Sequence, residues 1–203
     1  MKIICIGRNY SEHAKELKNE IPESPIFFMK PETALLKNNE DFYYPSFSKE
    51  IHYECELVIK INRNGKNILS EFAHKYYNEI TVGIDFTARD IQNMCKVKSL
   101  PWEQAKAFDN SAPIGNFLIL SDKQKQENIN FRLDVNGITV QNGNTKDMIF
   151  SIAQIIAYVS KYITLKTGDL IFTGTPSGIG PVKIGDRLTA QIEGKVLLDF
   201  EIK

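Results

Sequence analysis

The chain lacks net charge and is poor in cysteine. Its 203 residues include 25 Lys plus Arg against 25 Asp plus Glu, and three cysteines. Balanced charge gives no overall positive field for phosphate backbones or anionic lipid, so we expect neither a nucleic-acid nor a membrane partner. Cys5, Cys55 and Cys95 form no CxxC pair, which argues against a disulfide framework or a structural zinc site. This cysteine usage fits a reducing compartment.

Long apolar runs are also missing. Residues 3–6 are too few for the apolar core of a signal peptide, and no run approaches the ~20 residues that a membrane helix needs. We therefore expect a soluble, cytoplasmic protein. No internal repeat and no linker rich in Pro, Gly or Ser divides the sequence. A chain of this length then predicts a single domain over residues 1–203.

Short strands and tight turns dominate the local pattern. Asn64-Gly65, Asn136-Gly137 and Glu193-Gly194 each lie between short runs that alternate or are β-branched. Asn-Gly favours a type I′ hairpin turn because that turn needs positive φ at both central residues. The pattern predicts two hairpins, which pair 131–135 with 138–141 and 188–192 with 195–202.

Helical patterns are fewer. Apolar residues at helical spacing predict helices over 10–17, 88–96 and 149–160. The fold class expected from these patterns is mainly β with a few peripheral helices (α+β).

Two glutamates could carry chemistry. In the run from His52 to Ile61, Glu54 and Glu56 lie two residues apart, so in a strand they share a face. That face also holds Lys60, and many half-buried strands simply expose such a face to solvent. A solvated strand face and a functional carboxylate pair both remain open from this spacing alone.

Asp85 offers a third carboxylate. It lies near the end of the apolar run that begins at Ile80. Thr87 and Asp90 have the spacing of a capping box for the helix expected after them, so Asp85 is not needed as a cap. A carboxylate embedded in an apolar strand must then find another partner.

Convergence of Glu54, Glu56 and Asp85 would favour a cation among them. Mutual repulsion raises the pKa of clustered carboxyl groups unless positive charge lies between them. Oxygen ligands alone suit Mg²⁺ or Mn²⁺ and disfavour zinc. The residue types therefore indicate a hard divalent metal site as one hypothesis beside the solvated face.

The ordered series of motifs resembles the fumarylacetoacetate hydrolase family, in particular its short single-domain acylpyruvase and oxaloacetate decarboxylase branch. The matching segments extend from Gly7 to Lys203. They include Gly7-Arg8-Asn9-Tyr10, Phe28-Met29-Lys30-Pro31, Glu54-Cys55-Glu56-Leu57, Gly83-Ile84-Asp85-Phe86-Thr87-Ala88-Arg89-Asp90, Leu100-Pro101-Trp102, Lys106-Ala107-Phe108-Asp109, Asp147-Met148-Ile149-Phe150 and Thr173-Gly174-Thr175-Pro176-Ser177-Gly178. No single motif is decisive, but their joint occurrence in this order is highly specific.

The resemblance implies a mixed β-roll around a metal-containing pocket, assembled as a homodimer, with residues 9–22 as a mobile lid. By the same carry-over Glu54, Glu56 and Asp85 bind Mg²⁺ or Mn²⁺. The implied catalytic residues are His13, Glu16 and Lys106. The implied substrate-binding residues are Arg8, Lys30 near the pocket mouth, Arg89, Gln92 and Thr175.

Each of these residues also has an ordinary explanation. His13 and Glu16 are spaced like one solvated helix face, as are Arg89 and Gln92, and Lys106 alone would be a surface lysine. The segment from Thr173 to Pro181 is rich in glycine but lacks the Gly-Lys-Ser/Thr ending of a phosphate loop. It is either a plain turn or a loop whose backbone N–H groups and Thr175 hydroxyl bind a carboxylate.

The implied activity is cleavage of a C–C bond in a small 2-oxo acid through a metal-bound enolate. Acylpyruvate hydrolysis and oxaloacetate decarboxylation both fit, with a 2-oxo dicarboxylic or acylpyruvic acid as substrate. The alternatives are an isomerase or decarboxylase of 2-hydroxy-dienoates, an oxaloacetate keto-enol tautomerase, and a non-catalytic dimer that binds metal or carboxylate.

Overall fold

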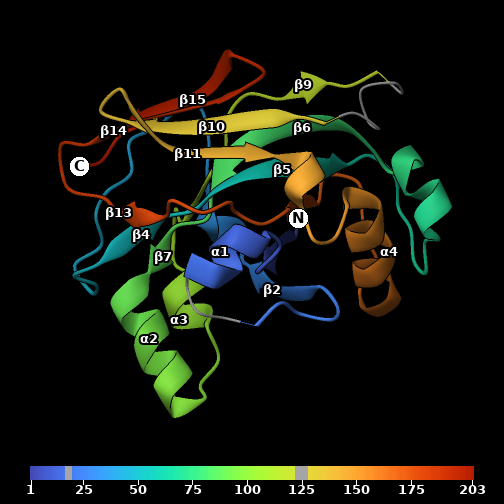
Figure 1. The fold of residues 1–203 in the computed structure, drawn as a ribbon, viewed down its shortest axis with the longest axis horizontal. Coiled ribbons are helices and arrows are strands. Elements are labelled where there is room, and N and C mark those ends of the chain that lie inside the picture. Colours follow the sequence, from blue (N-terminus) through green and yellow to red (C-terminus); the bar gives the residue numbers. More distant parts are fainter. Residues whose placement is uncertain (17–19, 122–127) are drawn as a thin grey trace.

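A mixed sheet of six strands runs through the middle of the protein in a computed structural model, which describes residues 1–16, 20–121 and 128–203 (Figure 1). Its order is β2 (Ile26–Lys30), β1 (Ile3–Gly7), β12 (Leu170–Phe172), β5 (Cys55–Ile61), β6 (Tyr77–Ile84) and β9 (Leu118–Ile119). Strands β1 and β12 run parallel, and the other neighbours are antiparallel.

A second sheet of four antiparallel strands lies beside this one, at the top of the view in Figure 1. Its order is β11 (Ile138–Asn144), β10 (Asn130–Val135), β14 (Arg187–Ile192) and β15 (Lys195–Glu201). Two small sheets complete the β structure. They join β13 (Gly180–Pro181), β4 (Ile51–Tyr53) and β7 (Thr87–Ala88), and, in parallel, β3 (Leu35–Leu36) and β8 (Ala112–Pro113). The mainly β, α+β prediction is confirmed.

The helices lie at the periphery of the sheets (Figure 1). The α-helices are α1 (Ser11–Glu16), α2 (Arg89–Lys98), α3 (Glu103–Lys106) and α4 (Ile152–Tyr162). Short 3₁₀ turns are η1 (Glu32–Ala34), η2 (Ser70–Lys75) and η4 (Thr145–Asp147). The structure describes no helix that is long and apolar enough to cross a membrane.

The predicted helices form, with shifted ends. Helix α4 begins after a Ser151 N-cap whose capping box is completed by Gln154, so residues 149–151 precede the helix. The capping box predicted for α2 is wrong. The Thr87 hydroxyl donates to the Asp85 carbonyl, and the Asp90 carboxylate accepts from Ser48 and Lys49 across the fold. Thr87 therefore bonds to a neighbouring carbonyl, and tertiary partners occupy the Asp90 carboxylate, so the two residues form no capping box.

Both predicted hairpins are confirmed, and they form the four-stranded sheet. Their turns have positive φ at both central residues, 53° and 78° at Asn136-Gly137 and 48° and 77° at Glu193-Gly194. Asn64-Gly65 closes no hairpin, because Gly65 instead pairs with the distant Leu165. These turn sequences close a hairpin only where the runs on both sides of the turn belong to the same sheet and bury one face of it.

The core lies between the two larger sheets. Leu57, Ile59 and Val82 of the six-stranded sheet belong to one buried cluster with Leu133 and Leu198 of the four-stranded sheet. A smaller cluster packs on the opposite face of the six-stranded sheet, around Ile3, Cys5, Val58 and Phe172. Strand β5 is therefore apolar on both faces along most of its length. The polar residues at its N-terminal end are the exception, and they mark the site.

Candidate active site

A pocket opens where the ends of strands β1, β5 and β6 meet helices α1, α2 and α3. Its walls contain nine of the eleven residues proposed for the site and add Lys96, Phe28 and Trp102. The proposed residues among its walls are Arg8, His13, Glu54, Glu56, Asp85, Arg89, Gln92, Lys106 and Thr175. Glu16 and Lys30 lie outside the walls and act on residues that line them.

The three carboxylates converge because the strands that carry them are interrupted there. Glu54 lies between β4 and β5, and Asp85 directly follows β6. The Asp85 N–H donates to the Glu54 carbonyl at 2.8 Å, which holds the two ends together. Glu54, Glu56 and Asp85 are 7%, 1% and 1% exposed, so the solvated-face alternative is excluded. One oxygen from each lies within 4.8 Å of the others.

Gln141 on β11 fixes the peptide between the two glutamates. Its side-chain oxygen accepts from the Cys55 N–H at 2.8 Å, and its amide donates to the Thr175 hydroxyl and the Pro176 carbonyl, both at 2.9 Å. The Thr175 hydroxyl in turn donates to the Cys55 carbonyl at 2.8 Å. Both backbone groups of Cys55 are thus held by side chains, which turns Glu54 and Glu56 into the pocket. The sequence analysis missed Gln141, because nothing local marks it.

Two buried cations neutralise Glu54. Lys106 Nζ lies 2.8 Å from Glu54 and 2.7 Å from Asp85, and Arg89 donates to the other Glu54 oxygen at 2.6 Å. Burial acts to raise the pKa of Glu54, but the charges of Lys106 and Arg89 outweigh it and hold that pKa well below its usual range. Burial likewise acts to lower the pKa of Lys106, and Asp85 and Glu54 reverse the effect and raise it. Lys106 is therefore part of the carboxylate cluster, not a surface lysine.

Glu56 has no such partner. Its carboxylate accepts the Gly174 N–H at 2.6 Å, and no cation of the described residues lies within ion-pair distance. Burial first, and then the charges of Asp85 and Glu54, raise the pKa of Glu56 well above its ordinary value. The pocket is therefore short of positive charge next to Glu56.

Lys30 does not lie near the pocket mouth, so that placement is wrong. Its side chain is fully buried behind Asp85, with Nζ 2.7 Å from Asp85 Oδ1. The three protons of this ammonium group have three other acceptors, the Phe86 carbonyl and the Ser111 carbonyl and hydroxyl. Asp85 Oδ1 is accordingly a buried carboxylate oxygen that accepts no hydrogen bond from the described residues. Lys30 supports Asp85 electrostatically from behind and leaves this oxygen available as a ligand.

These observations fit a hard divalent cation. The available ligand atoms are all carboxylate oxygens, and Glu56 is the one carboxylate of the three with no cation within ion-pair distance among the described residues. Binding of Mg²⁺ or Mn²⁺ by these oxygens would relieve the shortage of positive charge at Glu56. Cys55 does not compete as a ligand, because strand alternation turns its side chain away from both glutamates.

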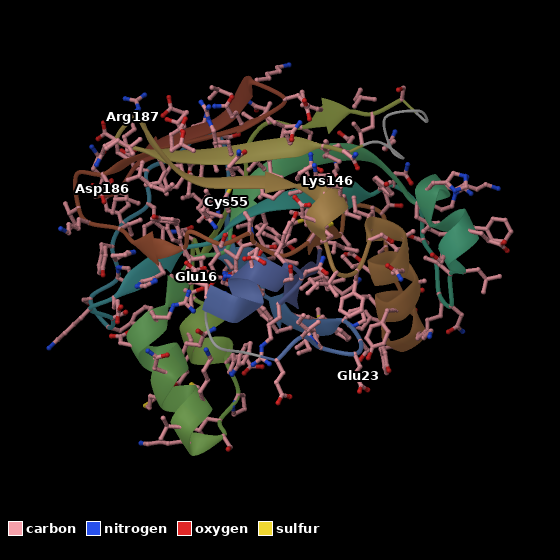
Figure 2. All side chains as sticks on the ribbon, viewed as in Figure 1. Glu16, Glu23, Cys55, Lys146, Asp186 and Arg187 are labelled. Carbon is pink, nitrogen blue, oxygen red and sulfur yellow. The ribbon has the colours of Figure 1, made fainter. Side chains whose placement is uncertain are left out.

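Helix α1 brings a histidine over the cluster. His13 Nδ1 lies 3.2 Å from a Glu16 carboxylate oxygen, and the His13 side chain is buried and lines the pocket. Glu16 lies on α1, near the middle of the view in Figure 2, and also accepts the Gly178 N–H at 3.2 and 3.3 Å. Of the predicted lid over 9–22, residues 17–19 lie outside the described residues. The predicted pairing of His13 with Glu16 is present.

The other end of α1 is anchored more firmly. The buried Asn9 side chain donates to the carbonyls of Phe150 and Thr173 and accepts the Phe150 N–H, at 3.0, 2.7 and 2.7 Å. The backbone carbonyl of Asn9 accepts the Ile149 N–H, and Tyr10 forms an isolated antiparallel β-bridge with Met148. Asn9 therefore ties the start of α1 to the segment before α4 and to the Gly-rich loop.

The Gly-rich loop, from Thr173 to Pro181, contributes a backbone N–H group to the site, whereas its Thr175 hydroxyl is not available there. Gly174 has φ of +100°, and a Cβ there would lie 2.6 Å from Asn9 Cβ, so only glycine lets its N–H reach Glu56. The Thr175 hydroxyl proton is directed to the Cys55 carbonyl and its oxygen accepts from Gln141. The hydroxyl expected to donate to a substrate carboxylate is therefore already engaged within the protein.

Helix α2 lines the pocket with one face. Arg89, Gln92 and Lys96 are spaced by three and four residues, and all three line the pocket. Arg89 donates to Gln92 at 2.6 Å, while its buried Nε–H has no acceptor among the described residues. Lys96 was missed by the sequence analysis, although it continues the spacing of Arg89 and Gln92 by one more turn.

Comparison with known proteins agrees with this geometry. Residues 2–202 match the profile described as fumarylacetoacetate (FAA) hydrolase C-terminal. The chain is 41% identical over 197 residues to an oxaloacetate tautomerase of Escherichia coli, covering 97% of this chain and 90% of the relative. It is 43% identical over 194 residues to a mitochondrial oxaloacetate decarboxylase of Dictyostelium discoideum, covering 95% and 89%. The crystal structure of fumarylpyruvate hydrolase from Pseudomonas aeruginosa, in complex with Mn²⁺ and pyruvate, is similar with a TM-score of 0.94 and 36% identity, covering 100% of this chain and 89% of the other.

Proposed function

Because the chain belongs to the fumarylacetoacetate hydrolase family, we propose that it is a divalent-metal-dependent enzyme that cleaves a C–C bond of a small 2-oxo acid through an enolate. Acylpyruvate hydrolysis and oxaloacetate decarboxylation are the reactions we assign to the site. The observation that carries the proposal is the buried convergence of Glu54, Glu56 and Asp85, in which Glu56 has no cation within ion-pair distance among the described residues.

Glu54, Glu56 and Asp85 would hold Mg²⁺ or Mn²⁺. When bound there, the metal supplies Lewis-acid stabilisation of negative charge on the substrate oxygens. Lys106 lies beside the same carboxylates and adds a fixed positive charge, worth more in a buried site than in water. Arg89 and Gln92 orient the substrate from α2, and the unpaired Nε–H of Arg89 suits a carboxylate oxygen.

In acylpyruvate hydrolysis, His13 takes a proton from water that attacks the distal carbonyl carbon. Glu16 lies against Nδ1 of His13 and orients the ring, which leaves the other ring nitrogen for the water. The C3–C4 bond then breaks, its electron pair forms the enolate of pyruvate, and the acyl fragment leaves as a carboxylic acid. Lys106 stabilises the negative charge that develops.

In oxaloacetate decarboxylation the same pocket needs no attacking water. The C3–C4 electron pair again forms the pyruvate enolate, and CO₂ leaves. A keto-enol tautomerase is the second candidate, supported by the Escherichia coli relative that bears this name and shares 41% of its residues with the chain. Both reactions develop negative charge on the C2 oxygen, in an enolate of pyruvate in decarboxylation and of oxaloacetate in tautomerisation, so one set of residues serves either.

We also propose that α1 is a lid. The pocket encloses about 40 Å³, room for about three water molecules at 10–15 Å³ each. A four-carbon keto acid needs more space than this. The Glu16 contact with Gly178 is the link that would have to open at the C-terminal end of α1.

Chelation provides the test of the proposal. Pyruvate release from acetylpyruvate and from oxaloacetate should require Mg²⁺ or Mn²⁺, fall to the uncatalysed rate after EDTA treatment and dialysis, and return when metal is added back. Activity that survives chelation would contradict the metal mechanism. No turnover of any 2-oxo acid with metal present would favour a non-catalytic protein that binds metal or carboxylate.

We further propose that the protein acts in the cytoplasm as a homodimer. An apolar groove on edge strand β2, lined by Ile26, Met29 and Leu100, is a surface that a second copy could cover. Sedimentation velocity at micromolar concentration should give a mass twice that of the 23.1 kDa chain. A monomer over that concentration range would refute the dimer without touching the assignment of the active site.

A further inference from the structure

Two cations toward the open end of the pocket have no acidic partner. Arg8 follows β1 and Lys96 lies on α2, and both line the pocket. No carboxylate of the described residues lies within ion-pair distance of either, whereas the deeper cations Arg89 and Lys106 pair with Glu54. Lys96 is exposed and Arg8 is half-buried, so both are accessible from the pocket entrance.

The surroundings of Lys96 are cationic. Lys96 is an exposed residue, but partial burial of its side chain lowers the pKa of its ammonium group; the charges of Arg89 and Arg8 lower that pKa further, and the charge of Glu54 acts in the opposite direction. Arg8 and Lys96 have no acidic partner among the described residues, and Arg89 keeps an unpaired buried Nε–H in the same pocket. Together these features describe a site that an anion would stabilise.

The carboxylate cluster does not use the positive charges of Arg8 and Lys96. Glu54 and Asp85 are paired with Arg89, Lys106 and Lys30. With a divalent ion beside Glu56, the deep end of the pocket needs no further cation. Arg8 and Lys96 are then left for a group of the substrate that lies farther from the metal than its 2-oxo acid end.

We infer that Arg8, Lys96 and the Nε–H of Arg89 form a second anion subsite, which binds the distal carboxylate of a 2-oxo dicarboxylate and protects the bond to that carboxylate. The inference rests on the proposed function, since it assumes that the 2-oxo acid end of the substrate binds at Glu54, Glu56 and Asp85. It adds to that function a preference for dianionic 2-oxo acids over acylpyruvates with a neutral tail.

The chemical consequence follows from where the charge moves. In decarboxylation of oxaloacetate the C3–C4 bond breaks, its electron pair becomes the enolate, neutral CO₂ leaves, and C3 then takes a proton. The distal carboxylate loses its charge on the way, so cations that bind it stabilise the substrate more than the transition state. In tautomerisation a proton leaves C3, another is added to the C2 oxygen, and the distal carboxylate keeps its charge. The subsite therefore favours tautomerisation of oxaloacetate over its decarboxylation.

The decisive experiment compares Lys96→Gln with Lys96→Arg, using Lys98→Gln as the matched control. Lys98 is an exposed lysine on the same helix that does not line the pocket. With Mg²⁺ and oxaloacetate, enol absorbance and pyruvate release are followed in the same sample. Lys96→Gln should raise KM for oxaloacetate about tenfold, because one charge-assisted hydrogen bond to the substrate is lost. It should also raise the ratio of decarboxylation to tautomerisation by a similar factor. Lys96→Arg should restore both values, and Lys98→Gln should change neither.

Two further ligands separate the subsite from the metal cluster. Acetylpyruvate lacks the distal carboxylate, so its KM should change much less than that of oxaloacetate in Lys96→Gln. Oxalate mimics the enolate of pyruvate and also lacks that group, so calorimetry should show it binding to the Mg²⁺-loaded variant as tightly as to the parent.

Equal effects of Lys96→Gln on both substrates, an unchanged reaction ratio, or the same shift in Lys98→Gln would overturn the subsite while leaving the proposed function intact. A parent enzyme that turns over neither substrate with metal would overturn both.

Discussion

Replacing Glu56 by Gln should abolish metal-dependent turnover and, without metal, leave the fold at least as stable as the parent. The variant removes one of three ligand carboxylates and keeps the side-chain size and an oxygen for the Gly174 N–H. Lewis-acid stabilisation is worth several kcal/mol, and each ~1.4 kcal/mol is tenfold in rate, so we expect a loss in kcat/KM of about 10³-fold or more.

The stability half of this prediction follows from the raised pKa of Glu56. A carboxyl group whose pKa is higher folded than unfolded contributes stability below its unfolded pKa, near the ordinary value of 4.5, and that contribution is lost as the pH rises through the folded pKa. At pH 7 without metal, Glu56 therefore contributes less to the stability of the parent than it does at acid pH. A neutral amide does not titrate and carries no such loss, so the metal-free Glu56→Gln variant should have an equal or higher Tm.

Thermal unfolding with and without Mn²⁺ checks both halves. The parent should gain Tm with Mn²⁺, and the variant should gain little. Glu79→Gln is the matched control, because Glu79 lies on β6, pairs with Lys60 at 2.9 Å and is partly exposed. It should keep both turnover and the metal-induced gain. A Glu56→Gln variant that still gains Tm with Mn²⁺ to the same extent as the parent would remove Glu56 from the ligand set.

Replacing His13 by Ala should separate the two C–C cleavage reactions. Acylpyruvate hydrolysis needs a base for water, and loss of a positioned base typically costs 10²–10⁴-fold, so acetylpyruvate turnover should fall by about that factor. Oxaloacetate decarboxylation uses no attacking water, so its rate should change by no more than a few-fold. Pyruvate release from the two substrates under the same metal concentration measures the difference.

The chain offers a second His-Glu pair as the control. His52 Nε2 lies 2.9 Å from Glu50, and neither residue lines the pocket. His52→Ala should leave both activities close to those of the parent. If His13→Ala lowers hydrolysis and decarboxylation equally, His13 serves a step common to both, and its assignment as the base for water is wrong.

The sequence predicted those features whose cause is local. The hairpin at Asn136-Gly137 follows from two residues that tolerate positive φ. The shared face of Glu54 and Glu56 follows from strand alternation. Their burial did not follow from it, because a solvated face has the same spacing, and their convergence with Asp85 was one hypothesis from the residue types until the resemblance to a family favoured it.

What the sequence did not predict depends on contacts between distant segments. Lys30 lies behind Asp85, 55 positions away, where its ammonium group completes a network with Ser111. Gln141 holds Cys55 from another sheet. Thr87 and Asp90 have the spacing of a cap, yet the Asp90 carboxylate accepts from Ser48, 42 positions away. Roles assigned to single side chains, the one-domain organisation and the dimer stay predictions.

The two ends of α1 are attached unequally. Its first end is fixed by the four hydrogen bonds of Asn9, all of them at 3.0 Å or less, while among the described residues its last end contacts the Gly-rich loop through one N–H group, that of Gly178, at 3.2 and 3.3 Å from the two Glu16 oxygens. If α1 is the lid proposed above, it would pivot at Asn9 and release at Glu16. That motion would separate His13 from the carboxylate cluster as the pocket opens to a substrate. The catalytic base would then reach its working position only in the closed pocket, so that water activation and substrate enclosure would become a single event.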